Sequence, residues 1–161
     1  MTLHYGLIGC GMMGHEHIQN IALLDDTEIS VIYEPDPEMC AFALKTVPTT
    51  KIVNSLKELL DHNPLDCLVV VSPNYCHMGQ LKEIARTRPL PILCEKPLYT
   101  DPRDLIDAED FSKNYKALAW VAMEYRYMPP VAAFIDLAKK TTGGVKTVSY
   151  THLTLPTMRL V

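Results

Sequence analysis

The sequence of 161 residues lacks the features that would place it in several common classes of protein. No apolar run approaches the roughly 18 residues that a membrane-spanning helix needs, so we expect no contact with a membrane. Acidic residues outnumber basic ones by 19 to 15 and the net charge is −4, so we expect no nucleic-acid partner. Met1 leads almost directly into an apolar run, without the basic and long apolar segments of a secretory signal, and we therefore expect a cytoplasmic protein.

Cysteine pairs with the spacing of metal ligands or redox centres are also missing. The chain has five cysteines, an odd number, and no C-x-x-C, which is typical of reduced thiols that pack as small apolar side chains. We expect Cys94 to be the one to test for reactivity. His15 and His17 flank Glu16, but residues two apart on a helix do not share a face, so we expect no metal site there. A place in the first helical turn, beside phosphates, fits them better.

What the sequence does contain is a glycine-rich turn between an apolar run at residues 5–8 and a helix-forming run. Gly9, Gly11 and Gly14 have the spacing G-x-G-x-x-G, which in a strand–turn–helix context is the fingerprint of a dinucleotide site. The first glycine permits a sharp turn, the second lets a pyrophosphate approach the backbone, and the third lets the helix pack closely. Met12 and Met13, between these glycines, are expected to pack over the bound dinucleotide.

An acidic residue strengthens this interpretation. Glu34 ends a second apolar run and lies 34 − 14 = 20 residues after the last glycine, where a carboxylate can accept hydrogen bonds from both ribose hydroxyls of an adenosine. The same charge would repel a 2′-phosphate, and Pro35 and Asp36 offer no cation, so NAD is favoured over NADP. The alternative is a strand–helix–strand unit in which the glycines only form a turn and Glu34 is solvated.

Apolar runs and helix-forming runs alternate along most of the chain. This alternation predicts an α/β fold with a doubly wound parallel sheet, the Rossmann fold, with its ligand at the carboxyl ends of the strands. Helices are expected at residues 13–24, 38–45, 101–113 and 131–139, with two more beginning after Ser55 and after Asn74. Strands are expected at residues 4–8, 29–33, 51–53, 66–72, 90–94 and 117–123.

Four segments together resemble the Gfo/Idh/MocA oxidoreductases over about residues 4–147. They are Gly9–Gly14 followed by His17, Ser72-Pro73-Asn74 followed by His77, Glu95-Lys96-Pro97, and a segment from Glu124 to Pro129 that contains Arg126. Ser72 stands where the family's loop has threonine and keeps the hydroxyl.

The resemblance implies roles for individual residues. Ser72, Pro73, Asn74 and His77 would border the nicotinamide, and Glu95 and Arg126 would belong to the same cofactor site. Lys96 would reach the nicotinamide ribose and the reacting carbon, where an ammonium stabilises a developing alkoxide and passes protons. Without the resemblance, a surface salt bridge between Lys96 and Glu95 would be the simpler interpretation.

The family also implies a second domain that carries the substrate pocket, and here we expect that domain to be truncated. The expected division is a dinucleotide-binding domain at 1–123, a linker helix and the start of the second domain at 124–147, and a non-native tail at 148–161. Residues 148–157 match one reading frame of a transposase-type sequencing adapter. The alternative is a genuine strand, since apolar and polar residues alternate there.

These observations lead to one functional hypothesis with two alternatives. The chain is expected to be the NAD-binding half of an oxidoreductase that transfers a hydride between a nicotinamide and a secondary alcohol of a sugar, inositol or related polyol. The truncated chain alone is expected to be inactive, and homo-oligomers are expected only for a full-length protein. The alternatives are a non-catalytic dinucleotide-binding or sensor protein and an S-adenosylmethionine methyltransferase, against which Glu95-Lys96-Pro97 argues.

Overall fold

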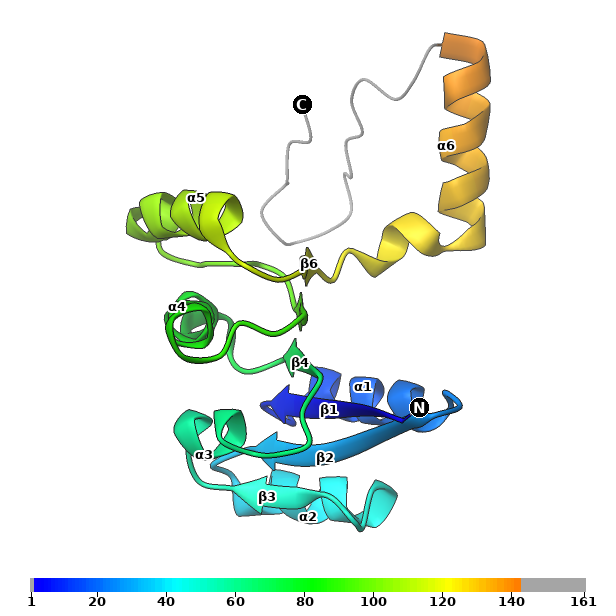
Figure 1. The fold of residues 1–161 in the computed structure, drawn as a ribbon. Coiled ribbons are helices and arrows are strands. Elements are labelled where there is room, and N and C mark those ends of the chain that lie inside the picture. The colour runs from blue at the N-terminus through cyan, green and yellow to red at the C-terminus, as the bar shows by residue number, and fades with distance from the viewer. Residues whose placement is uncertain (1, 143–161) are drawn as a thin grey trace. The chain divides into compact units, whose positions relative to one another are not determined.

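The computed structural model describes residues 2–142 and contains one sheet of six parallel strands (Figure 1). The order across the sheet is β3-β2-β1-β4-β5-β6, which confirms the predicted doubly wound Rossmann fold. The strands are β1 (Leu3–Ile8), β2 (Thr27–Tyr33), β3 (Lys51–Val53), β4 (Cys67–Val70), β5 (Ile92–Cys94) and β6 (Ala119–Val121).

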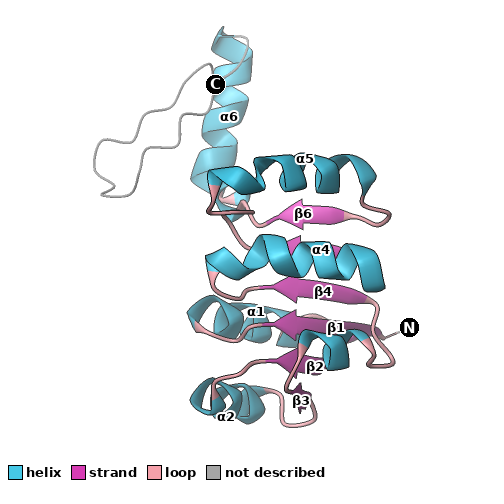
Figure 2. Cartoon of the chain, turned by 90° about the vertical axis from the view of Figure 1, so that its left-hand side faces the viewer, coloured by secondary structure: helices cyan, strands magenta, loops and turns pink. Residues whose placement is uncertain are grey.

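The helices that lie between the strands in the chain connect them and cover the sheet (Figure 2), and two further helices, η3 and α6, follow the last strand. They are α1 (Met12–Ala22), α2 (Pro37–Thr46), α3 (Leu56–Leu60), α4 (His77–Thr87), α5 (Leu105–Asn114) and α6 (Pro129–Thr142), with short 3₁₀ helices η1 (Asn74–Cys76), η2 (Pro102–Asp104) and η3 (Glu124–Tyr127). Most boundaries differ from the expected ones by one to three residues. The 3₁₀ helix η3 was not expected, and α6 begins at Pro129 rather than two residues later.

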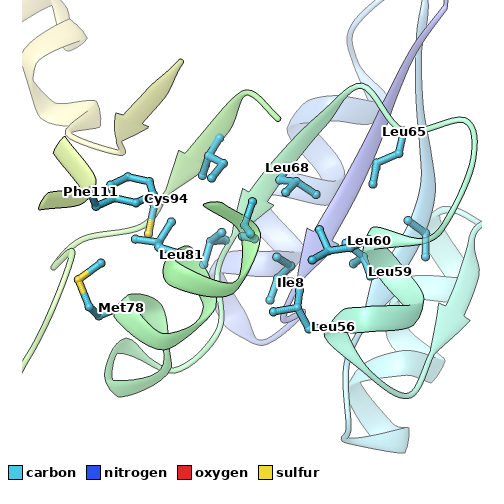
Figure 3. Packing of buried hydrophobic residues seen from close by; sticks show 14 of the residues in the cluster. Ile8, Leu56, Leu59, Leu60, Leu65, Leu68, Met78, Leu81, Cys94 and Phe111 are labelled. Atoms are coloured by element: carbon cyan, nitrogen blue, oxygen red, sulfur yellow. The ribbon is translucent and has the colours of Figure 1, made fainter. Parts of the chain in front are cut away.

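Two apolar clusters lie on opposite faces of the sheet because successive strand residues point to opposite faces. Leu7 belongs to the cluster under α1 and α2, and the next residue, Ile8, belongs to the cluster under α3, α4 and α5. The second cluster is the larger and extends from Leu56 on α3 to Phe111 on α5 (Figure 3). With both faces covered, the strands are continuously apolar, as Leu68, Val69 and Val70 are on β4.

Local sequence explains where two of the helices begin. Asp36 accepts a hydrogen bond from the backbone N–H of Glu38 at 2.8 Å, and Pro37 follows as the first helical residue of α2. Ser55 accepts from the backbone N–H of Glu58 at 3.2 Å and caps α3. Asp36 and Ser55 therefore mark the starts of α2 and α3, and α2 begins one residue earlier than expected.

The chain divides into two compact units at Ala122 and Met123. The first contains the sheet with α1 to α5, and the described part of the second contains η3 and α6. The predicted non-native tail at 148–161 lies outside the described residues, as does the end of the predicted linker segment. Within residues 2–142, no helix combines the length and the apolar character needed to cross a membrane.

Candidate dinucleotide site

The turn between β1 and α1 depends on Gly9, which has a backbone φ of +95°. A Cβ at this position would lie 2.7 Å from both the backbone N and the Cα of Ser72 at the end of β4. The backbone N–H of Gly9 donates to the carbonyl of Tyr33, the last residue of β2, at 2.8 Å. Gly9 thus passes between two neighbouring strand ends, in a conformation and a space that only glycine tolerates.

The next two glycines have different surroundings. A Cβ at Gly11 would have no neighbouring atom within 4 Å, so this glycine faces open space at the N-cap of α1. A Cβ at Gly14 would lie 3.1 Å from the carbonyl oxygen of Gly9, so Gly14 allows α1 to pack against the turn. Because Gly11 has no side chain to cap the helix, the first N–H groups of α1 remain available to an anion beside open space. The arrangement fits a pyrophosphate.

Glu34, which follows β2, forms a hydrogen bond to the glycine turn. Its carboxylate accepts hydrogen bonds from the backbone N–H of Cys10 at 2.7 Å and of Asp36 at 2.9 Å. A carboxylate has about four acceptor sites, so it can also accept from ligand hydroxyls. Burial, and then the negative charge of Glu34, raise the pKa of the Cys10 thiol to about 12, so this cysteine stays a neutral part of the turn.

At the end of β4, the expected nicotinamide loop divides into exposed and buried parts. Pro73 and Asn74 are exposed, and Ser72 is half-buried with its hydroxyl donating to the amide oxygen of Gln80. His77 is completely buried. Its Nδ1 lies 2.8 Å from the carbonyl oxygen of Pro97 and its Nε2 lies 2.9 Å from that of Ser72. The His77 ring thus contacts two protein carbonyls, and no pattern in the sequence predicts these contacts.

The segment after β5 places Glu95 and Lys96 in opposite environments. Glu95 is only 5% exposed, and its Oε1 lies 2.9 Å from Nε2 of His17 on α1. Its Oε2 accepts from the backbone N–H of Lys96 at 3.3 Å. The Lys96 side chain is exposed and, within residues 2–142, forms no ion pair. The alternative salt bridge between Lys96 and Glu95 is therefore not formed, because the buried Glu95 carboxylate contacts His17 instead. For His17, a place beside the phosphates had been expected.

The remaining candidates lie in less specific surroundings. Met12 is 80% exposed and Met13 is half-buried, both in the first turn of α1. Arg126 is exposed on η3 and belongs to the second unit. Cys94 is buried at the end of β5, and this burial raises the pKa of its thiol to about 12, which argues against the reactivity considered for it.

Each of the four segments follows one strand: the glycine turn follows β1, Glu34 follows β2, Ser72–Asn74 follow β4, and Glu95–Lys96 follow β5. These strands are neighbours in the sheet, in the order β2-β1-β4-β5. Because all these strands are parallel, the four segments lie along one edge of the sheet. The sequence predicted this assembly from the order of the elements. It did not predict the two imidazole contacts that connect the segments, because residues 78 and 20 positions apart in the chain form them.

Comparison with known proteins gives the same picture. Residues 3–123 match the sequence family described as "Oxidoreductase family, NAD-binding Rossmann fold". An inositol 2-dehydrogenase of Leifsonia xyli subsp. xyli is 35% identical over 105 residues, which are 65% of this chain and 30% of that protein. An uncharacterized oxidoreductase of Streptococcus pneumoniae serotype 4 is 33% identical over 107 residues, 65% of this chain and 28% of that protein.

Solved structures support the fold. The crystal structure of myo-inositol dehydrogenase from Lactobacillus casei, in complex with NAD(H) and myo-inositol, superposes with a TM-score of 0.77 at 24% identity. The alignment covers 90% of this chain and 43% of that one. The matched residues therefore cover less than a third of the length of these two curated relatives and less than half of this structural neighbour.

Proposed function

The chain belongs to the Gfo/Idh/MocA family of oxidoreductases, and from this membership we propose that it is the NAD-binding part of a dehydrogenase that acts on a sugar, inositol or related polyol. The observation that carries the proposal is the combination of open space at Gly11 with the carboxylate of Glu34 at the neighbouring strand end. One accommodates the pyrophosphate and the other receives the adenosine ribose. Inositol 2-dehydrogenases among the relatives support this substrate class.

The charge at the end of β2 supports NAD rather than NADP. Glu34 lies at the end of β2, where we propose that the adenosine ribose binds, and the backbone N–H groups of Cys10 and Asp36 hold its carboxylate in place. A held carboxylate cannot turn away from an incoming phosphate without losing both hydrogen bonds. Repulsion between like charges in this partly buried position disfavours the phosphorylated ribose.

Lys96 is the residue that we propose for the chemistry. A bound nicotinamide would supply the hydride transfer, and the protein would orient the reactants. The Lys96 ammonium is exposed at the end of β5, with its backbone N–H bonded to Glu95. There it can hold the substrate hydroxyl and stabilise the alkoxide as the proton leaves. Ser72, Pro73 and Asn74, on the neighbouring loop, would border the nicotinamide.

The first test is a calorimetric titration of the 161-residue chain with NADH, NADPH and S-adenosylmethionine. We expect NADH to bind, NADPH to bind at least tenfold more weakly, which corresponds to about 1.4 kcal/mol, and S-adenosylmethionine not to bind. Glu34→Arg should weaken NADH binding and remove the discrimination against NADPH. Glu109→Arg, the same charge change at an exposed position on α5, should leave both affinities unchanged.

The alternative outcomes separate the rival functions. Equal binding of NADH and NADPH by the wild-type chain would contradict the role of Glu34. Binding of S-adenosylmethionine by a folded chain would favour a methyltransferase. If the full-length protein bound NADH without oxidising any polyol, a non-catalytic dinucleotide-binding or sensor protein would be the better assignment.

A further inference from the structure

Lys96 lies in the segment Glu95–Pro97, and the buried carboxylate of Glu95 holds this segment on the N-terminal side of the lysine. Glu95 is 5% exposed, and a carboxylate taken out of water needs polar partners to offset the loss of hydration. His17 supplies one partner at 2.9 Å and the backbone N–H of Lys96 supplies another at 3.3 Å. His17 lies on α1, the helix that begins at the glycine turn. The contact therefore connects the phosphate end of the site to the end of β5.

The same segment is held on its C-terminal side by a second imidazole. His77 is completely buried, with its Nδ1 2.8 Å from the carbonyl oxygen of Pro97 and its Nε2 2.9 Å from that of Ser72. A neutral imidazole donates through one nitrogen and an imidazolium through both, so in either form the ring bonds to at least one of these carbonyls. His77 thereby connects the loop after β4 to the loop after β5.

We propose that His17 and His77 are positioning residues that fix Lys96 and the nicotinamide end of the site from its two sides. This inference rests on the proposed function. The two neighbours of Lys96 are both held, whereas its own side chain is exposed and unpaired within the described residues. The backbone of Lys96 is thus held in place while its ammonium stays exposed, and a side chain that must contact a reacting atom needs both.

The proposal makes a prediction that a purely structural role would not. The glycine turn and Glu34, which we propose to hold the ADP-ribose part of a dinucleotide, do not accept or donate any of the hydrogen bonds that the two imidazoles form within the described residues. Loosening the Glu95–Pro97 segment should therefore weaken binding of NADH but leave ADP-ribose, which lacks the nicotinamide, nearly unaffected. General destabilisation would lower both affinities together.

The experiment compares NADH and ADP-ribose by calorimetry for the wild-type chain, His17→Gln, Glu95→Gln and the double variant. We expect each single variant to bind NADH at least fivefold more weakly and ADP-ribose within twofold of wild type. Because the two side chains act as one pair, the double variant should be no worse than the worse single variant. His4→Gln, which changes a histidine whose Nδ1 contacts Ser30, is the matched control and should change neither affinity.

His77→Gln provides an independent arm, and its thermal unfolding is measured first because the side chain is completely buried. If that variant does not fold, the His17 and Glu95 variants decide. Equal losses for NADH and ADP-ribose, or no loss of either, would overturn the proposal. A folded wild-type chain that binds ADP-ribose but not NADH would also overturn it, whereas one that binds neither would overturn the proposed function itself.

Discussion

The two ends of the parallel sheet differ in how their connecting segments are held. At the carboxyl end, the turn after β1 is built from glycines, and the open space at Gly11 remains beside the N-terminus of α1. At the amino end, side chains form hydrogen bonds to the connecting segments. Arg88, after α4, donates to the carbonyl oxygens of Leu60, His62 and Leu65 and to the side chain of Asn63, at distances between 2.7 and 3.2 Å.

Further contacts close the amino end. The backbone N–H of His4 donates to the carboxylate of Asp66 at 2.8 Å, and the N–H of Asp66 donates to the carbonyl of His4 at the same distance. The hydroxyl of Tyr115 donates to the carbonyl of Leu90, and burial raises the pKa of this phenol to about 12. Side-chain hydrogen bonds thus close the amino end, whereas open space remains beside Gly11 at the carboxyl end, where we propose that the ligand binds. If so, substitutions at the two ends should separate loss of stability from loss of binding.

Gly9→Ala should have the largest effect, and it should break this separation. The new Cβ would lie 2.7 Å from backbone atoms of Ser72 at a backbone φ of +95°, so both the turn and the end of β4 would have to move. We expect a loss of about 3 kcal/mol or more in unfolding free energy, together with loss of NADH binding. Thermal and urea unfolding measure the first, and titration measures the second.

Gly79→Ala is the matched control for this change. Gly79 lies on α4 with no atom within 4 Å of its added Cβ, and alanine is the better helix former by about 1 kcal/mol. The control should raise stability and leave NADH affinity unchanged. A Gly9→Ala chain as stable as wild type would contradict the close approach between the turn and β4.

Arg88→Ala should have the next largest effect, and on stability alone. The planar guanidinium reaches four acceptors in the α3–β4 connection, and its loss leaves partly buried carbonyls without their charged donor. We expect a loss of about 2 kcal/mol in unfolding free energy with unchanged NADH affinity in the folded fraction. Arg86→Ala, at an exposed position two residues earlier, should do neither. A loss of affinity by folded Arg88→Ala would show that the two ends are coupled.

Gly11→Ala should give the opposite result at the carboxyl end. Its backbone, with φ −67° and ψ −158°, is extended and accessible to alanine, and the Cβ would meet no protein atom. The same Cβ would occupy the space left for a pyrophosphate, so NADH should bind at least tenfold more weakly, by about 1.4 kcal/mol. The unfolding free energy should fall by less than about 1 kcal/mol, because alanine is a poorer N-cap than glycine. Unchanged NADH affinity would place the phosphates elsewhere.

The separation along the chain between interacting residues explains what the sequence could predict. Gly9, Gly11, Gly14 and Glu34 lie within 26 residues of chain, and each has a local conformational or electrostatic reason for its identity. Their pattern therefore predicts both the turn and the chemistry of one half of the site. The strands were predictable for a similar reason, because apolar runs and helix signals are local.

The contacts of His17, His77 and Arg88 were beyond such reasoning. His17 was expected in the first turn of its helix, beside phosphates, but it lies in the second turn of α1 and contacts Glu95, 78 positions later in the chain. Likewise, nothing near Arg88 in the chain identifies four acceptors between residues 60 and 65. A side chain's partner is decided by which segments the folded sheet brings together. Local pattern thus predicts the elements but not the contacts that hold their connections.

The smallest predicted effect concerns pH and again lies at the amino end. Burial, and then the positive charges of Lys51, Arg88 and His4, lower the pKa of His62, with Glu28 acting in the opposite direction. The unfolded chain therefore takes up this proton more readily than the folded one, so the stability that the neutral ring contributes is lost as pH falls below about 6.5. Between about pH 7.5 and pH 5.5, the Tm of wild type should fall slightly more than that of His62→Gln. NADH affinity of the folded chain should not distinguish the two proteins, since His62 lies at the end of the sheet away from the glycine turn. A steeper fall in Tm for His62→Gln than for wild type would mean that the folded protein favours the protonated His62 ring, and would contradict the expected direction of its pKa shift.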